Sequence, residues 1–96
     1  MAMTLSTHVL DTERGRPAGG VHVEVWRGDE LVGSGETDED GRIRELAESE
    51  PGTYRIAFAP PSPFFRRVEL EVELGDGHHH VPLLVSSYAC ASYRGS

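Results

Sequence analysis

Alternation of apolar and polar residues constrains the fold of this chain more than any other sequence feature. It is clearest over residues 68–74, where valine and leucine alternate with Glu69, Glu71 and Glu73. Residues 21–26 and 54–58 follow the same pattern. Because successive side chains of a β-strand point to opposite faces, each segment predicts a strand with one buried and one solvated face.

Glycine- and proline-containing turns separate these segments. Gly28 and Asp29 predict a short hairpin, and residues 38–41 predict a turn that ends in a glycine with positive φ. A weak helical pattern over residues 44–50 is too short to predict a stable helix. We predict eight strands, over residues 4–11, 21–27, 30–37, 42–47, 53–59, 65–74, 78–86 and 88–94. Short strands separated by turns every 8–12 residues or so are typical of an antiparallel sandwich.

Size and charge narrow the classes of function. A chain of 96 residues predicts a single domain, residues 1–96, whose small core would gain from oligomerisation. A net charge of −7 argues against nucleic acid or an anionic membrane as the partner. A single cysteine, Cys90, excludes an internal disulfide, and we expect this thiol to be packed or partly buried. Because no leader or membrane-spanning pattern is present, we expect a cytoplasmic protein.

Residues able to carry chemistry concentrate towards the two ends of the sequence. Four of the five histidines lie there, at His8, His78, His79 and His80. A strand places His78 and His80 on one face and His79 on the other. An isolated strand histidine such as His8 is more often structural than catalytic. Three clustered imidazoles could also capture zinc adventitiously, but we predict no functional metal.

Five segments carry a family resemblance. They are Leu-Ser-Thr-His-Val-Leu-Asp at residues 5–11, Gly-Arg-Pro-Ala at 15–18, Thr-Asp-Glu-Asp-Gly-Arg at 37–42, His-His-His-Val-Pro-Leu-Leu at 78–84, and the terminal Tyr-Arg-Gly-Ser at 93–96. With these motifs the chain resembles the 5-hydroxyisourate hydrolases, the transthyretin-related enzymes of purine catabolism. The resemblance runs nearly from end to end.

The resemblance implies an all-β, transthyretin-like (prealbumin-like) sandwich of two four-stranded sheets. It also implies a homotetramer, with active sites in the clefts where two dimers meet. The chain is shorter than the family pattern at residues 59–65. We therefore predict that the helix after the fifth strand is reduced or absent.

The resemblance further implies hydrolysis of 5-hydroxyisourate to 2-oxo-4-hydroxy-4-carboxy-5-ureidoimidazoline in urate degradation, without a metal or organic cofactor. The motif matches imply a catalytic set of His8, Arg42, His80 and Ser96, and substrate-binding roles for His78, Tyr93, Arg94 and Gly95. The alternative is a non-enzymatic transthyretin-like module that uses the same residues to bind a small planar ligand.

The residue types suit ring opening by water. Histidine, with an unperturbed pKa of about 6.5, can act as base and then as acid near neutral pH. Arginine remains charged and can stabilise an oxyanion on a flat ring, a role we assign to Arg42 over its neighbour Arg44. Whether His8 or His80 activates water stays open at this point. So does the effect of residues 89–91, which depart from the family pattern near the proposed pocket.

Overall fold

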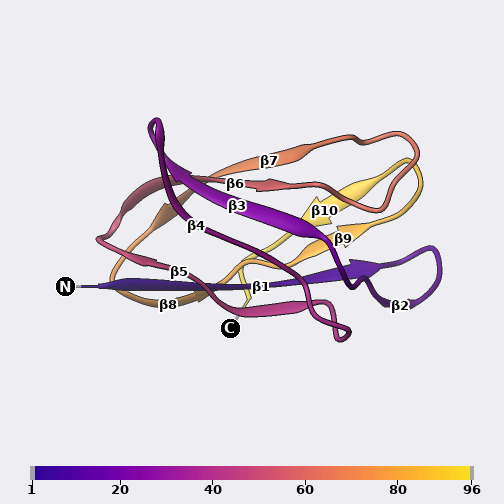
Figure 1. Ribbon diagram of the computed structural model, residues 1–96, viewed down its shortest axis with the longest axis horizontal. Coiled ribbons are helices and arrows are strands. Elements are labelled where there is room, and N and C mark those ends of the chain that lie inside the picture. Colours follow the sequence, from indigo (N-terminus) through magenta and orange to yellow (C-terminus); the bar gives the residue numbers. More distant parts are fainter. Residues whose placement is uncertain (1, 96) are drawn as a thin grey trace.

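The structure is a computed structural model that describes residues 2–95. It consists of two β-sheets packed face to face (Figure 1). One sheet has four antiparallel strands in the order β4–β3–β6–β7. These strands are β3 (His22–Arg27), β4 (Glu30–Glu36), β6 (Gly52–Phe58) and β7 (Val68–Leu74). The described residues contain no helix that could span a membrane.

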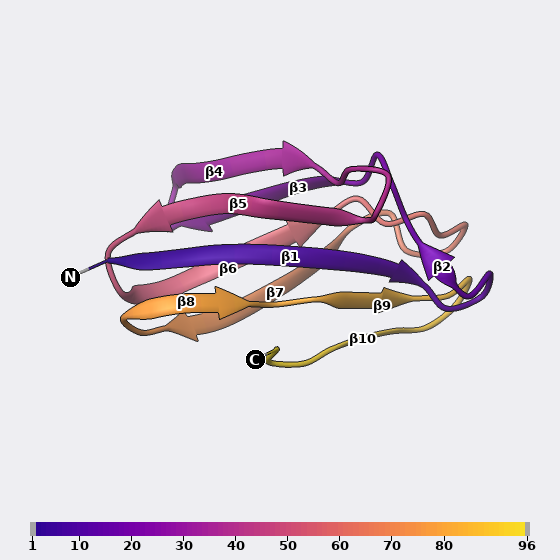
Figure 2. The ribbon, with the colours of Figure 1, turned by 90° about the horizontal axis from the view of Figure 1, so that it is seen from below.

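The second sheet is built on β1, which lies at its centre in Figure 2. On one side β1 pairs with β5 and with the two-residue β2, both antiparallel. On the other side it pairs in parallel with β8 and then β9, and β10 pairs with β9 at the edge. The strands are β1 (Met3–Asp11), β2 (Arg16–Pro17), β5 (Arg42–Ser49), β8 (Gly77–His80), β9 (Leu83–Val85) and β10 (Cys90–Ser92).

The predicted sandwich is confirmed, but its strands differ from the prediction. It is not wholly antiparallel, because β1 pairs in parallel with β8 and β9, and the short strand β2 was not predicted. The segment 78–86 is not one continuous strand but is divided into β8 and β9 at Val81 and Pro82, because proline has no N–H to donate to a ladder. Since β8 and β9 follow one another along β1, this sheet has four main strand positions, with β2 as a short addition. Among the described residues, no helix occurs between β6 and β7, as the short segment predicts.

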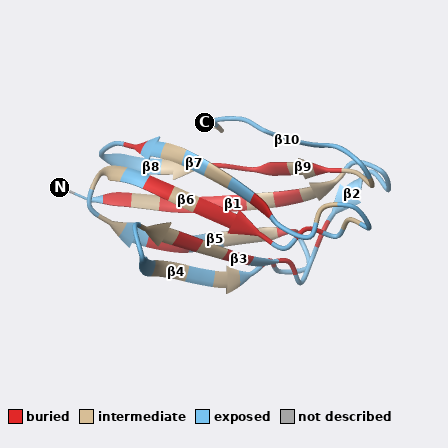
Figure 3. Ribbon diagram, turned by 90° about the horizontal axis from the view of Figure 1, so that it is seen from above, coloured by how far each residue is buried: buried red, intermediate tan, exposed pale blue. Residues whose placement is uncertain are grey.

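The core lies between the sheets and follows the predicted alternation (Figure 3). The carboxylates of β7 are exposed, whereas Val68 and Leu74 at its ends are buried. The prediction for Cys90 is wrong: its side chain is exposed, because β10 is an edge strand that pairs only with β9. Fully buried side chains include Met3, Leu5, Val9, Val23, Val25, Tyr54, Ile56, Phe58, Leu83 and Val85.

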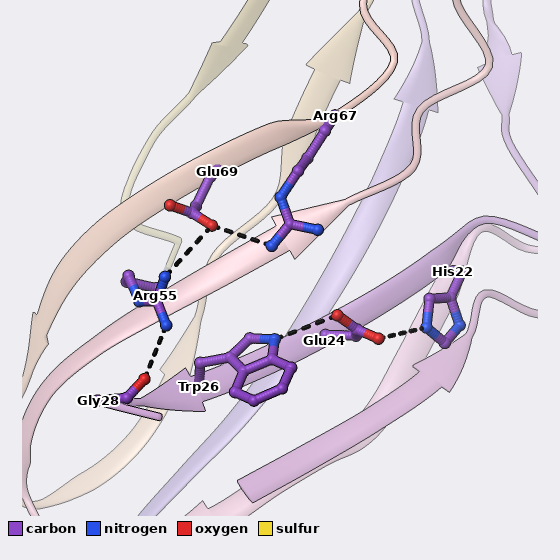
Figure 4. Close-up of polar contacts among 7 residues, drawn as sticks. All are labelled: His22, Glu24, Trp26, Gly28, Arg55, Arg67 and Glu69. Carbon is purple, nitrogen blue, oxygen red and sulfur yellow. Dashed lines mark hydrogen bonds and ion pairs between the residues drawn. The ribbon is translucent and has the colours of Figure 1, made fainter. Parts of the chain in front are cut away.

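The outer face of the four-stranded sheet carries polar side chains that contact one another (Figure 4). The Trp26 indole Nε1 donates to Glu24 Oε1 at 3.1 Å, and the other Glu24 oxygen is 3.1 Å from His22 Nε2. On the neighbouring strands β6 and β7, Nη1 of Arg55 lies 3.7 Å from Oε1 of Glu69. Trp26 therefore packs on the outer sheet face within a polar network.

The turn before β5 holds the start of that strand against β1. Oδ1 of Asp38 accepts hydrogen bonds from the backbone N–H groups of Asp40 and Arg42, both at 2.9 Å. The backbone N–H of Val9 donates to the Gly41 carbonyl at 2.7 Å. Arg42 thus begins β5 at a position set by this turn.

Gly41→Ala is expected to destabilise the fold more than Gly20→Ala. Both glycines have positive φ, at 76° and 74°, which costs an alanine about 1 kcal/mol. A Cβ at Gly41 would also lie 2.5 Å from the Val9 carbonyl oxygen, whereas a Cβ at Gly20 meets no atom within 4 Å. We expect Gly41→Ala to lower the free energy of unfolding by about 3 kcal/mol, measured by urea denaturation. Equal losses in the two variants would contradict this packing.

Candidate active site

His8 and Arg42 lie directly opposite one another across the β1–β5 ladder. Their side chains therefore share the outer face of the sheet. Nε2 of His8 donates to the Asp40 carbonyl oxygen at 2.9 Å. Because a carbonyl can only accept, Nε2 carries the hydrogen, and Nδ1 of the neutral ring is free to accept one.

The parallel β1–β8 ladder brings two more histidines to this face. Thr4 pairs with His78 and Ser6 pairs with His80. Thr4 and Ser6 alternate with buried residues of β1, on the same face as His8. His79 faces the other way, and its Nε2 donates to the Gly75 carbonyl oxygen at 2.9 Å. The predicted separation of the three histidines is confirmed.

Four side chains form a continuous hydrogen-bonded row across these two strands. Oγ1 of Thr4 lies 2.8 Å from Nδ1 of His78. Oγ of Ser6 lies 3.0 Å from Nε2 of His78 and 2.8 Å from Nδ1 of His80. Thr4 and Ser6 are not among the predicted site residues. The available signal was their spacing of four and two residues before His8, which places them on the same strand face.

An open pocket of about 220 Å³ lies over this row. Two guanidinium groups and two imidazoles reach it, although the whole chain carries a net charge of −7. Such a concentration of donors suits a flat, oxygen-rich, electron-rich ring. The lining residues are Ser6, Thr7, Arg42, Ile43, Arg44, His78 and His80.

His80 is the titratable group most affected by this surrounding. Its burial, followed by the positive charges of Arg42, His8 and His78, lowers the pKa of His80 below its ordinary value of 6.5. The ring is therefore neutral over more of the physiological pH range than a free histidine. A neutral imidazole can accept a proton, which is the property a general base needs.

In an NMR pH titration, His80 is expected to titrate below pH 6.5. In Arg42→Gln, loss of the nearby positive charge should move the midpoint upward, towards the ordinary histidine value. The matched control is Arg16→Gln, on β2, which should leave the midpoint unchanged. A midpoint above 6.5 in the unmodified protein, or no rise in Arg42→Gln, would contradict the placement of these charges.

Gly95, the last residue that the structure describes, lies against His80. The backbone N–H of Gly95 donates to the His80 carbonyl oxygen at 2.8 Å. A Cβ at Gly95 would lie 2.7 Å from Cδ2 of the His80 ring, so only glycine fits there without displacement. The predicted residue Ser96 lies outside the described residues.

Tyr93 and Arg94 do not join this pocket within one chain. They line a larger groove of about 800 Å³ beside β7. Carboxylates of Glu69, Glu71 and Glu73 line the same groove, so it is a poor match for an electron-rich, oxygen-rich ligand. The structure therefore brings together five of the predicted site residues: His8, Arg42, His78, His80 and Gly95.

Comparison with known proteins gives matches along nearly the whole chain. The model of the HIUase/Transthyretin family matches residues 5–95. The 5-hydroxyisourate hydrolase of Deinococcus radiodurans is 39% identical over 96% of this chain and 95% of its own length. The uric acid degradation bifunctional protein TTL of Arabidopsis thaliana is 38% identical over 96% of this chain, which spans only 37% of that longer protein.

A solved structure also matches closely. The 5-hydroxyisourate hydrolase of Klebsiella pneumoniae superposes with a TM-score of 0.88 at 32% sequence identity, covering 98% of this chain and 99% of its own.

Proposed function

Because this chain belongs to the HIUase/Transthyretin family, we propose that it hydrolyses 5-hydroxyisourate to 2-oxo-4-hydroxy-4-carboxy-5-ureidoimidazoline, a step of urate degradation. The observation that carries the proposal is the cationic pocket lined by Arg42 and His80, with His8 directly opposite Arg42 across the β1–β5 ladder. The names of the relatives support the same substrate. The reaction needs no metal or organic cofactor in this proposal.

His80 is the base that activates water. Its pKa is lowered, so the ring is neutral and able to accept a proton. Its Nδ1 is engaged by Ser6, which leaves Nε2 for the water. The activated water attacks a ring carbonyl carbon, the ring C–N bond breaks, and the leaving nitrogen takes the proton back from Nε2. This sequence produces the carboxy and ureido groups of the product.

Arg42 and His8 hold the substrate during this attack. The guanidinium of Arg42 stabilises the negative charge that develops on the carbonyl oxygen. Because Nε2–H of His8 is bound by the Asp40 carbonyl, Nδ1 of His8 accepts a hydrogen bond from a ring N–H. His80 thus moves the proton and His8 orients the ring.

The proposal includes a homotetramer. The pocket lies on the outer face of a sheet, and one chain alone leaves Tyr93 and Arg94 in a different groove. A second chain packed over this face would enclose the ring and exclude bulk water. Substrate-binding roles for Tyr93, Arg94 and Gly95, and a catalytic role for Ser96, belong to this assembled site.

The proposed activity is tested by stopped-flow absorbance. Freshly generated 5-hydroxyisourate is mixed with micromolar protein, and its decay is compared with the uncatalysed decay in the same buffer. The proposal predicts a decay rate proportional to protein concentration and at least about tenfold faster than the control. Saturable binding of uric acid with no faster decay would instead favour the non-enzymatic binding module.

A further inference from the structure

We propose that Ser6 relays protons between His80 and His78, so that the positive charge formed during catalysis resides on His78. This inference rests on the proposed function, in which His80 takes a proton from water. It assigns roles to Ser6, as a positioning residue that acts through His80, and to His78, as the acceptor at the end of the relay. It starts from the two contacts of the Ser6 hydroxyl, 2.8 Å to His80 and 3.0 Å to His78.

A serine hydroxyl has a single hydrogen, and this restricts the two contacts. Ser6 can donate to only one of the two imidazoles, so it must accept from the other. If Ser6 donates to Nε2 of His78, then Nδ1 of His80 carries a hydrogen and Nε2 of His80 is a free base. If Ser6 donates to Nδ1 of His80, then Nε2 of His80 carries the hydrogen and is an acid. The hydroxyl therefore couples the tautomers of the two rings.

The proton transfers balance between these two arrangements. Water gives a proton to Nε2 of His80, and the remaining hydroxide attacks the ring carbonyl carbon. Nδ1 of His80 passes its proton to Oγ of Ser6, and Ser6 passes its own to Nε2 of His78. His80 and Ser6 end neutral and His78 carries the positive charge. When Nε2 of His80 protonates the leaving nitrogen, the same two transfers run backward and restore the start.

Burial and charge favour this distribution. His80 is partly buried, and the nearby guanidinium of Arg42 further disfavours a positive charge on its ring. Arg44 of β5 lines the same pocket. His78 is exposed to solvent, where an imidazolium is hydrated at little cost.

Thr4 holds the far end of the row in register. Its hydroxyl lies 2.8 Å from Nδ1 of His78, which aims Nε2 of that ring at Ser6. Ser6 itself is 8% exposed, so bulk water has little access to replace its hydroxyl in the row. These contacts link Thr4, His78, Ser6 and His80 in one unbroken row of hydrogen bonds.

The test compares kcat and KM of Ser6→Ala, His78→Phe and the double variant with those of the unmodified protein. Each single variant is expected to lower kcat about tenfold and to change KM less than about threefold. Because both changes cut the same relay, the double variant should be no slower than the slower single variant. Ser6→Thr, which keeps a hydroxyl, should recover most of kcat. The matched control His79→Gln, on the opposite face of β8, should retain kcat.

Tautomer detection by ¹⁵N NMR gives a second readout that does not depend on turnover. The Nδ1 and Nε2 shifts of His80 should respond to protonation of His78 in the unmodified protein and should cease to do so in Ser6→Ala. Retention of this response in Ser6→Ala, or losses of kcat that add in the double variant, would overturn the relay. Absence of any hydrolysis by the unmodified protein would instead refute the proposed function, so the two failures are distinguishable.

Discussion

Replacing His80 with asparagine is expected to lower kcat by at least about 100-fold without unfolding the protein. The asparagine amide occupies about the same space as the part of the histidine ring nearest the backbone. It can still form a hydrogen bond with Ser6, which contacts Nδ1 of the native ring. It cannot accept a proton near neutral pH, so water activation is lost. The measurement is stopped-flow turnover of 5-hydroxyisourate, together with thermal unfolding followed by circular dichroism.

The control for this variant is His79→Asn. It makes the same chemical change one residue away, on the face of β8 that contacts the Gly75 carbonyl. Its kcat should stay within about twofold of the native value, because no proton in the proposed reaction passes through His79. If His80→Asn turned over normally, His80 would have no part in the mechanism.

Replacing Arg42 with glutamine is expected to lower kcat/KM by about 100-fold to 1000-fold. Glutamine keeps hydrogen-bonding groups but removes the fixed positive charge that stabilises the developing oxyanion. Arg42 lies opposite His8 across the ladder, and its charge acts on His80. Steady-state kinetics over a range of substrate concentrations give the value.

Arg44→Gln is the informative comparison, because Arg44 lines the same pocket but is more exposed. Its loss is expected to cost less than about tenfold in kcat/KM. A greater loss in Arg44→Gln than in Arg42→Gln would transfer the oxyanion-stabilising role to Arg44.

Strand alternation was sufficient to predict the sandwich and the facing of most side chains. The exposed carboxylates of β7 and the buried residues of β3 and β6 follow from a period of two. The division of the segment after β7 at Val81 and Pro82 was not predicted. Pro82 marks the interruption. Because β8 and β9 run in the same direction along β1, however, the residue pattern on either side of Pro82 resembles a single strand.

The candidate site was only partly predictable for a different reason. His8, Arg42 and His80 stand in recognisable motifs, whereas the contacts of Ser6 join residues 72 and 74 positions apart in the chain. Those contacts depend on the register of a parallel ladder, which no local pattern specifies. Tyr93 and Arg94 were predicted from their motif alone, and the path of the chain after β10 places them beside β7 within one chain.

The placement of the substrate is best tested by a crystal structure with bound uric acid, a stable planar relative of 5-hydroxyisourate. We expect the ring to occupy the cationic pocket, with a carbonyl oxygen on Arg42 and an edge facing Nε2 of His80. If uric acid bound only in the carboxylate-lined groove beside β7, that result would contradict the proposed site.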